Sequence, residues 1–338
     1  MTKHILKNGG VASIILFLTI VLLAACGEPN EEEPANAITQ ENEIEQAEGE
    51  GQSEETAEQL EVQFPVTIVD DAGNEMTIEE EPQSIVSIQA SITEISFALG
   101  LGDKMVGVSD FCNYPEEALS VENVGGQDMN AELIVDLLPD IALVTDYHYD
   151  NHGEVLSQFE EVGINVVVIG SKSSFDEVYK SIALIGKATG RSIEAEEIIS
   201  DMKERHETVK EKVEDITDKK RVWVEVSPAP DIYTTGKGTF MHEMLESIQA
   251  INVAEDHEGW VNLTEEETVQ LQPDVIITTY HSEDLKGEVS SRDGWTEVPA
   301  VKNEQIFDVE SDTVVRPGPR LIEGVETLAN LIYPEIFQ

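Results

Sequence analysis

A segment of this sequence occurs twice, and the repetition limits the folds that the chain can adopt. Residues 130–145 are NAELIVDLLPDIALVT, and residues 264–279 are TEEETVQLQPDVIITT. Each copy predicts a short capped helix, a Pro-Asp turn and an apolar strand. A unit that recurs half a chain apart indicates two lobes of similar build, with a cleft between them for a small ligand. The alternative is that such helix–turn–strand units occur in any α/β protein.

The N-terminal residues predict an exported, lipid-anchored protein. Lys3 and Lys7 precede an apolar run at 11–23, which leads through Ala-Ala to Cys26. This order is typical of a secretory signal peptide, and the run is short for a membrane span, which needs about 20 residues. The cysteine after Leu-Ala-Ala resembles the lipobox of bacterial lipoproteins. That resemblance implies a signal peptide at 1–25 and a lipid on Cys26, at the extracytoplasmic face of the cell membrane. The alternative is an ordinary signal peptide with an incidental cysteine.

The segment at 26–62 carries no fold signal. Residues 28–61 contain thirteen glutamates and no lysine, arginine or aromatic residue, so we expect a disordered acidic tether. The net charge of the chain is −49, and −36 remains without these thirteen glutamates. This acidity argues against a nucleic-acid partner, because phosphate binding needs lysine and arginine. Once Cys26 is lipidated, Cys112 is the one remaining thiol, and we expect it to be a small buried residue.

The body of the chain predicts α/β lobes. A hairpin is expected at 66–78, where two alternating segments flank a turn with glycine. Continuous apolar strands then alternate with helices, which is typical of a mainly parallel sheet covered on both faces. The expected strands are 85–88, 105–108, 141–144, 164–169, 221–226, 275–278 and 306–309. The expected helices are 93–99, 131–138, 154–162, 240–248, 265–271 and 319–331.

Between the lobes the pattern becomes helical. Ser174 and Glu177 predict a capping box, Gly190 ends that helix, and Ser192 is expected to cap a second one. Helical spacing then continues over 193–216, about 36 Å at 1.5 Å per residue, which is long enough to cross between lobes. The alternative is a surface helix on one lobe. We therefore expect an N-terminal lobe, a helical connector and a C-terminal lobe at 63–172, 173–218 and 219–338.

This arrangement resembles the substrate-binding lipoproteins of ABC importers for iron chelates and vitamin B12, over nearly the whole body. The shared motifs are weak singly and specific in sum. They are PQSIVSI at 82–88, TEI at 93–95, ALGLGD at 98–103, VGVS at 106–109, YP at 114–115, LLPD at 137–140, YTTG at 233–236, QPD at 272–274 and RPGPR at 316–320. The resemblance implies two Rossmann-like lobes joined by one long helix, with the ligand between them and little hinge motion.

The resemblance also gives the repeated glutamates a role. In this family one carboxylate on each lobe docks onto arginines of the membrane permease, and by motif position these are Glu132 and Glu266. The alternative is structural. Both follow expected N-caps, where a carboxylate stabilises the helix dipole by roughly 0.3–1 kcal/mol without any partner.

The resemblance further implies a cleft lined by aromatic side chains. Trp260 and Phe111 match positions at which vitamin B12 binders carry aromatics, and Tyr114 follows three residues after Phe111. Such side chains hold a large flat ligand well, although core packing is the alternative for Phe111. Gly126, the counterpart of Trp260 in the first lobe, departs from this pattern and weakens the vitamin B12 assignment.

Further candidates follow the repeated strands. Tyr147, Tyr280 and His281 come directly after them, and ligands of open α/β sheets bind beyond the carboxyl ends of strands. Arg316 is another candidate, because an anionic ferric siderophore or haem favours local arginine. The alternative is that Arg316 or Arg320 fixes the last helix. The scarcity of arginine favours a ligand with little net negative charge, such as a corrinoid.

Metal and enzyme functions find less support. Asp146, His148 and His152 are spaced as possible ligands, but no HxxxH helix or cysteine cluster accompanies them, so we expect no metal site and no cofactor. The glycines at 100–107 miss the dinucleotide fingerprint, and GxxxxGK[ST] and GxSxG are absent. We therefore expect a monomeric binding lipoprotein, not an enzyme, that delivers cobalamin or another corrinoid to an ABC permease with its ATPase. A ferric siderophore or haem is the alternative ligand, and an exported α/β enzyme is the alternative class.

Overall fold

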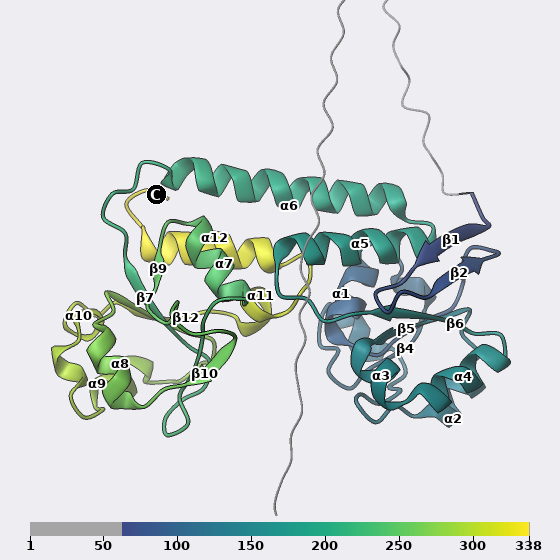
Figure 1. The fold of residues 1–338 in the computed structure, drawn as a ribbon, viewed down its shortest axis with the longest axis horizontal. Coiled ribbons are helices and arrows are strands. Elements are labelled where there is room, and N and C mark those ends of the chain that lie inside the picture. Colours follow the sequence, from purple (N-terminus) through teal and green to yellow (C-terminus); the bar gives the residue numbers. More distant parts are fainter. Residues whose placement is uncertain (1–62, 338) are drawn as a thin grey trace, which may run out of the picture. The chain divides into compact units, whose positions relative to one another are not determined.

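The computed structural model describes residues 63–337, so the predicted signal peptide, Cys26 and nearly all of the predicted tether lie outside the described residues. Two four-stranded parallel sheets form the frame of the described part, together with two antiparallel strand pairs (Figure 1). None of the described helices combines the length and apolar character that a membrane span requires.

The N-terminal lobe begins with the predicted hairpin. Strands β1 (Val66–Val69) and β2 (Glu75–Ile78) pair antiparallel, around a turn in which the Asp70 carboxylate accepts two backbone N–H groups. The parallel sheet follows, and its strands are β3 (Ile85–Ser87), β4 (Met105–Val108), β5 (Ile141–Thr145) and β6 (Asn165–Ile169). The helices of this lobe are α1 (Ala90–Ala98), α2 (Ala131–Leu137), α3 (Asp146–Asn151) and α4 (Gly153–Glu161), with 3-10 turns at Gly102–Lys104 and Glu116–Ser120. Of these helices, α3 was not predicted.

The C-terminal lobe repeats the strand order of the first. Its parallel sheet contains β7 (Arg221–Glu225), β9 (Ile251–Asn252), β11 (Val275–Thr278) and β12 (Ile306–Asp308). The orders are β4-β3-β5-β6 and β9-β7-β11-β12, so in each sheet the first strand along the chain lies between the second and the third. A separate antiparallel pair consists of β8 (Tyr233–Thr235) and β10 (Trp260–Asn262). The helices are α7 (Phe240–Ser247), α8 (Glu265–Leu271), α9 (Leu285–Ser290), α10 (Pro299–Lys302), α11 (Ser311–Val315) and α12 (Leu321–Ile332), with a 3-10 turn at Trp295–Glu297.

The two copies of the repeat fold alike. Asn130 caps α2 and Thr264 caps α8, each accepting a hydrogen bond from the third amide of its helix, as predicted. Thr264 also forms the predicted capping box with Glu267. The C-cap residues of the two helices, Leu138 and Gln272, share a left-handed conformation with φ of 44° and 45°. The common strand order and these matching helix ends confirm two lobes of the same build.

Two helices connect the lobes. Helix α5 (Phe175–Thr189) ends at the left-handed Gly190, and the 22-residue α6 (Ser192–Val213) starts two residues later. At 1.5 Å per residue α6 is about 33 Å long. It packs against α5 and against α12 of the C-terminal lobe (Figure 1), so it crosses from one lobe to the other.

The beginnings of these two helices differ from prediction. Ser174 caps α5, but the Glu177 carboxylate accepts the amide of Ser173 at 2.8 Å instead of that of Ser174, so only half of the expected box forms. Ser192 is not a cap: it is the first helical residue of α6. The turn at Gly190 leaves only Arg191 between the helices, and its carbonyl already accepts the amide of Ala195. Arg191 therefore takes the cap position, without a side-chain bond.

Apolar side chains alternate between the two faces of each sheet. On β5, Ile141 and Leu143 face one core, while Ala142 and Val144 face another. Burial on both faces explains why the strands are continuous apolar runs. The first of these cores is shared: it includes residues of both sheets and of α5, α6 and α12.

Candidate functional site

Both sheets have a place where the strand order reverses. The reversal lies between β3 and β5 in the N-terminal lobe and between β7 and β11 in the C-terminal lobe. Ligands of open α/β sheets bind beyond the carboxyl ends of strands at such points. Tyr147 lies two residues after β5, and Tyr280 lies two residues after β11. The repeat therefore brings a tyrosine to the same edge of each sheet.

Phe111 occupies space that a side chain at position 126 would need. The ring is 61% exposed, and a Cβ placed on Gly126 would lie only 2.6 Å from its Cε2 atom. Real Cβ atoms essentially never come so close. An aromatic residue at 126 and Phe111 in this position therefore exclude each other. The N-terminal lobe thus carries the exposed ring of Phe111 beside Gly126, the counterpart of Trp260.

His148, next to Tyr147, belongs to the structure of α3. His148 is 3% exposed; its Nδ1 lies 2.7 Å from the Thr145 hydroxyl, and its Nε2 lies 3.0 Å from the carbonyl oxygen of Gly126. Burial lowers the pKa of His148, which favours the neutral ring. Asp146 accepts the amide and the hydroxyl of Ser171. Within residues 63–337, no three His, Cys, Asp or Glu side chains are grouped so that they could hold a metal ion.

In the C-terminal lobe the β8–β10 pair presents two exposed rings. Trp260 is 56% exposed and lies opposite Thr235, while Tyr233 is 43% exposed and lies two positions from Thr235 on the same strand. Side chains two positions apart point to the same face of a strand, so both rings lie on one face of the pair. Tyr233 was not predicted as a site residue, although the period of two along YTT is the signal that marks it.

Tyr280 is engaged inside the C-terminal lobe. Its hydroxyl donates to Glu225, and Arg292 donates to both oxygens of the same carboxylate at 2.7 and 2.8 Å. Glu225 is fully buried. Burial and the nearby carboxylate raise the pKa of Tyr280, so the hydroxyl keeps its proton. His281, the other residue after this strand, is exposed and lies 2.8 Å from Asp308.

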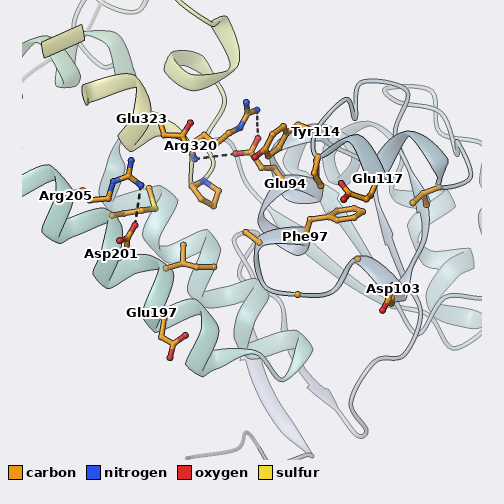
Figure 2. Close-up of a pocket in the computed structure, with 18 residues that line it drawn as sticks. Glu94, Phe97, Asp103, Tyr114, Glu117, Glu197, Asp201, Arg205, Arg320 and Glu323 are labelled. Atoms are coloured by element: carbon orange, nitrogen blue, oxygen red, sulfur yellow. Dashed lines mark hydrogen bonds and ion pairs between the residues drawn. The ribbon is translucent and has the colours of Figure 1, made fainter. Parts of the chain in front are cut away.

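The RPGPR motif binds the N-terminal lobe through a buried carboxylate. Glu94 on α1 is 3% exposed, and the Arg320 guanidinium donates to it at 2.8 Å (Figure 2). Arg316 lies 3.7 Å from Glu94 and 2.7 Å from Asp312. A Cβ on Gly318 would lie 2.9 Å from Glu94, so this contact requires glycine. Arg316, a predicted ligand contact, is therefore paired between the lobes.

Tyr114 lies under the same arginine. The guanidinium carbon of Arg320 is 3.7 Å from the centre of the Tyr114 ring, which is a cation–π contact. Both residues line a cavity of about 940 Å³ between α1, α6 and the start of α12 (Figure 2). Its wall combines apolar residues with carboxylates, among them Asp103, Glu117, Glu197, Asp201 and Glu323. Neither Phe111 nor Trp260 lines this cavity, so it does not bring all the predicted aromatic residues together.

Glu132 and Glu266 occupy equivalent places. Each is the second residue of its helix, α2 and α8, and each is exposed. The structure thus places one accessible carboxylate at the same position of each lobe.

Comparison with known proteins agrees with this architecture. A family model described as periplasmic binding protein matches residues 85–313. A Bacillus subtilis protein, the uncharacterized ABC transporter substrate-binding lipoprotein YvrC, is 42% identical over 335 residues, which is 98% of this chain and 99% of the relative. A cobalamin-binding protein of Halobacterium salinarum is 27% identical over 80% of this chain and 74% of the relative. The crystal structure of a possible iron-binding (periplasmic solute-binding) protein from Staphylococcus epidermidis superposes with a TM-score of 0.67 at 33% identity, covering 75% of this chain and all of that one.

Proposed function

Because this chain belongs to the periplasmic binding protein family, we propose that it binds cobalamin or a related corrinoid and delivers it to the permease of an ABC importer. Its general function follows from the family: it is a substrate-binding protein of an ABC transporter, of the type that handles vitamin B12, iron chelates or haem. The corrinoid is the more specific part of the proposal.

The pairing of the arginines carries the choice of ligand. All three arginines of the C-terminal lobe beyond β7 have carboxylate partners: Arg292 has Glu225, while Arg316 and Arg320 share Glu94 and Asp312. An anionic siderophore or haem is best held by arginines that are free to pair with it. A bulky ligand with little net charge needs exposed rings instead, and Phe111, Trp260 and Tyr233 supply them. The cobalamin-binding relative supports the same choice.

A ferric siderophore or haem is the second candidate. The similarity to a structure described as possibly iron-binding favours it. The same residues would line the site, and Arg316 or Arg320 would have to leave Glu94 to meet an anionic ligand.

Titration of the purified protein distinguishes these ligands. We expect cyanocobalamin to bind saturably, with haem and a panel of ferric siderophores binding weakly or not at all, as measured by calorimetry and absorbance. Trp260→Ala should weaken cobalamin binding by about tenfold or more, because a large aromatic contact is lost. Tyr149→Ala, which removes a ring that is 43% exposed on α3, is the control and should have little effect. Saturable binding of a siderophore without cobalamin binding would overturn the corrinoid proposal, and conversion of the ligand to a product would indicate an enzyme.

We also propose that Glu132 and Glu266 dock onto arginines of the permease. Their equivalent, exposed positions on α2 and α8 support this role. Changing both to alanine should abolish uptake by cells and leave ligand affinity intact. The matched control is Asp136→Ala with Gln270→Ala, at exposed positions four residues further along the same helices, and it should transport normally. Normal uptake by the glutamate double variant would contradict docking at these residues.

A lipid on Cys26 would hold the protein at the outer face of the cell membrane. The relative YvrC is named a lipoprotein, and its similarity extends over 98% of this chain. The acidic segment that follows Cys26 would then separate the lobes from the membrane surface.

A further inference from the structure

A small cavity lies where the N-terminal lobe meets the RPGPR motif. Its volume is about 170 Å³, and its wall includes the start of α1, residues 170–172 after β6, Ser181 of α5 and Pro317. None of the aromatic residues proposed to contact the chelate lines it. Its wall mixes apolar residues, among them Ile92, Ile95 and Ile169, with polar groups from three segments of the chain.

The first of these groups is the N-terminus of α1. This nine-residue helix begins after Gln89 without a side-chain cap and without an acidic residue in its first turn. The first amides of a helix have no acceptor within the helix, and together with the helix dipole they attract an anion. Gln89, Ser91 and Ile92 line the cavity, so this helix start borders it directly.

The second group is a buried lysine. The Lys172 side chain is only 9% exposed, and its Nζ lies 2.6 Å from an oxygen of Asp71. An ammonium group has three N–H donors, and the bond to Asp71 uses one of them. Lys172 thus has donors left for a ligand in the cavity.

The third group is a hydroxyl without a partner. Ser181 is 2% exposed, and its Oγ makes no hydrogen bond. Buried polar groups nearly always have a partner, and an exception indicates a ligand or a water molecule. Ser181 contributes to the cavity wall from α5, which packs beside α1.

We propose that this cavity binds one small anion, an oxyanion or a carboxylate group, at the N-terminus of α1. Helix amides, an ammonium and a hydroxyl are all donors, and their combination suits an anion. A volume of about 170 Å³ accommodates a group the size of phosphate or acetate, whereas drug-sized ligands need about 300 Å³ or more. The anion is either free in the medium or an acidic substituent of a chelate bound between the lobes.

Titration with free anions tests the site without any chelate. Sodium phosphate, sulfate and acetate are titrated into the purified protein by calorimetry, with sodium chloride keeping the ionic strength constant. We expect saturable binding of at least one of them. Lys172→Gln should weaken it by about tenfold or more, and Ser181→Ala by about three- to tenfold. Lys180→Gln removes the same charge from an exposed position on α5 and should leave affinity unchanged. Lys172→Arg retains the charge and should retain part of the affinity, which separates loss of the site from misfolding.

A second titration tests the chelate as the source of the anion, and this arm alone rests on the proposed function. Cobalamin is compared with a derivative in which one side-chain amide is hydrolysed to a carboxylate. If that carboxylate enters the cavity, the derivative binds several-fold more tightly, and Lys172→Gln and Ser181→Ala remove the preference but not cobalamin binding itself. The proposal is overturned if neither the free anions nor the carboxylate derivative respond to these two substitutions. Failure of both cobalamins to bind, with anion binding intact, would refute the corrinoid proposal alone.

Discussion

Glu94 joins the two lobes through a buried carboxylate. It lies on α1 of the N-terminal lobe, is 3% exposed, and meets two arginines of the C-terminal lobe. The Arg316 Nη1 and Arg320 Nε atoms are buried and have no hydrogen-bond partner. Without the Glu94 carboxylate these guanidinium groups would stay buried with only Asp312 to balance them, and an uncompensated buried charge strongly destabilises a protein.

We therefore predict that Glu94→Gln lowers the free energy of unfolding by about 3 kcal/mol, measured by urea denaturation. Glu323→Gln is the control, because Glu323 lines the cavity beside the same arginine but is exposed. It should change stability by less than about 0.5 kcal/mol. Equal stability of the two variants would show that the lobes do not depend on this ion pair.

At the scale of elements, α6 is the part that holds the lobes together. Arg205 pairs with Glu326 of α12 at 2.7 Å, and this contact raises the pKa of Arg205 despite partial burial. The next residue, His206, packs against Phe175 of α5, with ring centres 4.7 Å apart. Burial lowers the pKa of His206 to about 4, with a smaller contribution from Lys210. The helix thus carries a histidine that stays neutral in the folded protein at pH values well below the usual histidine pKa.

This histidine should make the protein acid-sensitive. Above pH 6.5 it is neutral in both states and costs nothing; between pH 6.5 and about 4 the unfolded chain binds a proton that the folded chain does not. At about 1.4 kcal/mol per pK unit, stability should fall by up to about 3 kcal/mol over this window. His206→Phe keeps a ring beside Phe175. It should reduce the slope of the urea-unfolding free energy against pH in this window by the equivalent of about one bound proton. His257→Phe, at an exposed position, should not; the same pH slope in both variants would show that His206 is not the cause.

The limits of sequence-based prediction also appear at this scale. The repeated caps, Asn130 and Thr264, were predicted correctly because a cap is a local signal a few residues long. Ser192 was predicted wrongly because the turn at Gly190 shifts the start of α6 by one residue. The contacts of the candidate site were even harder to predict from the sequence. Glu94 and Arg320 are 226 positions apart, and the place of the Phe111 ring over Gly126 depends on how two loops pack. No local pattern carries such contacts.

At the scale of the whole molecule, charge is the dominant feature. The chain has a formal net charge of −49, and self-repulsion of this kind weakens a compact state. Salt screens exposed charges beyond about 10 Å at 0.1 M, whereas buried pairs such as Glu94 with Arg320 are screened much less. Salt should therefore relieve the repulsion without removing the contacts between the lobes.

We predict that the melting temperature rises as sodium chloride increases from about 0.05 M to about 1 M, a range over which the screening length falls severalfold. Scanning calorimetry measures the change. Near pH 4 many carboxylates are protonated, so the rise should be smaller there. A melting temperature that falls with salt at neutral pH would mean that attractive surface pairs outweigh the repulsion.

The apolar core that passes from one sheet through α5, α6 and α12 to the other has a consequence for how the chain is divided. Two lobes with the same strand order could each have enclosed a core of its own, but here each contributes side chains to an apolar core that it shares with the other. If the chain were divided between the lobes, each fragment would expose apolar surface that the other normally covers. We expect neither fragment to fold until the two associate. The lobes are alike in strand order, yet we expect each to need the other for a complete interior.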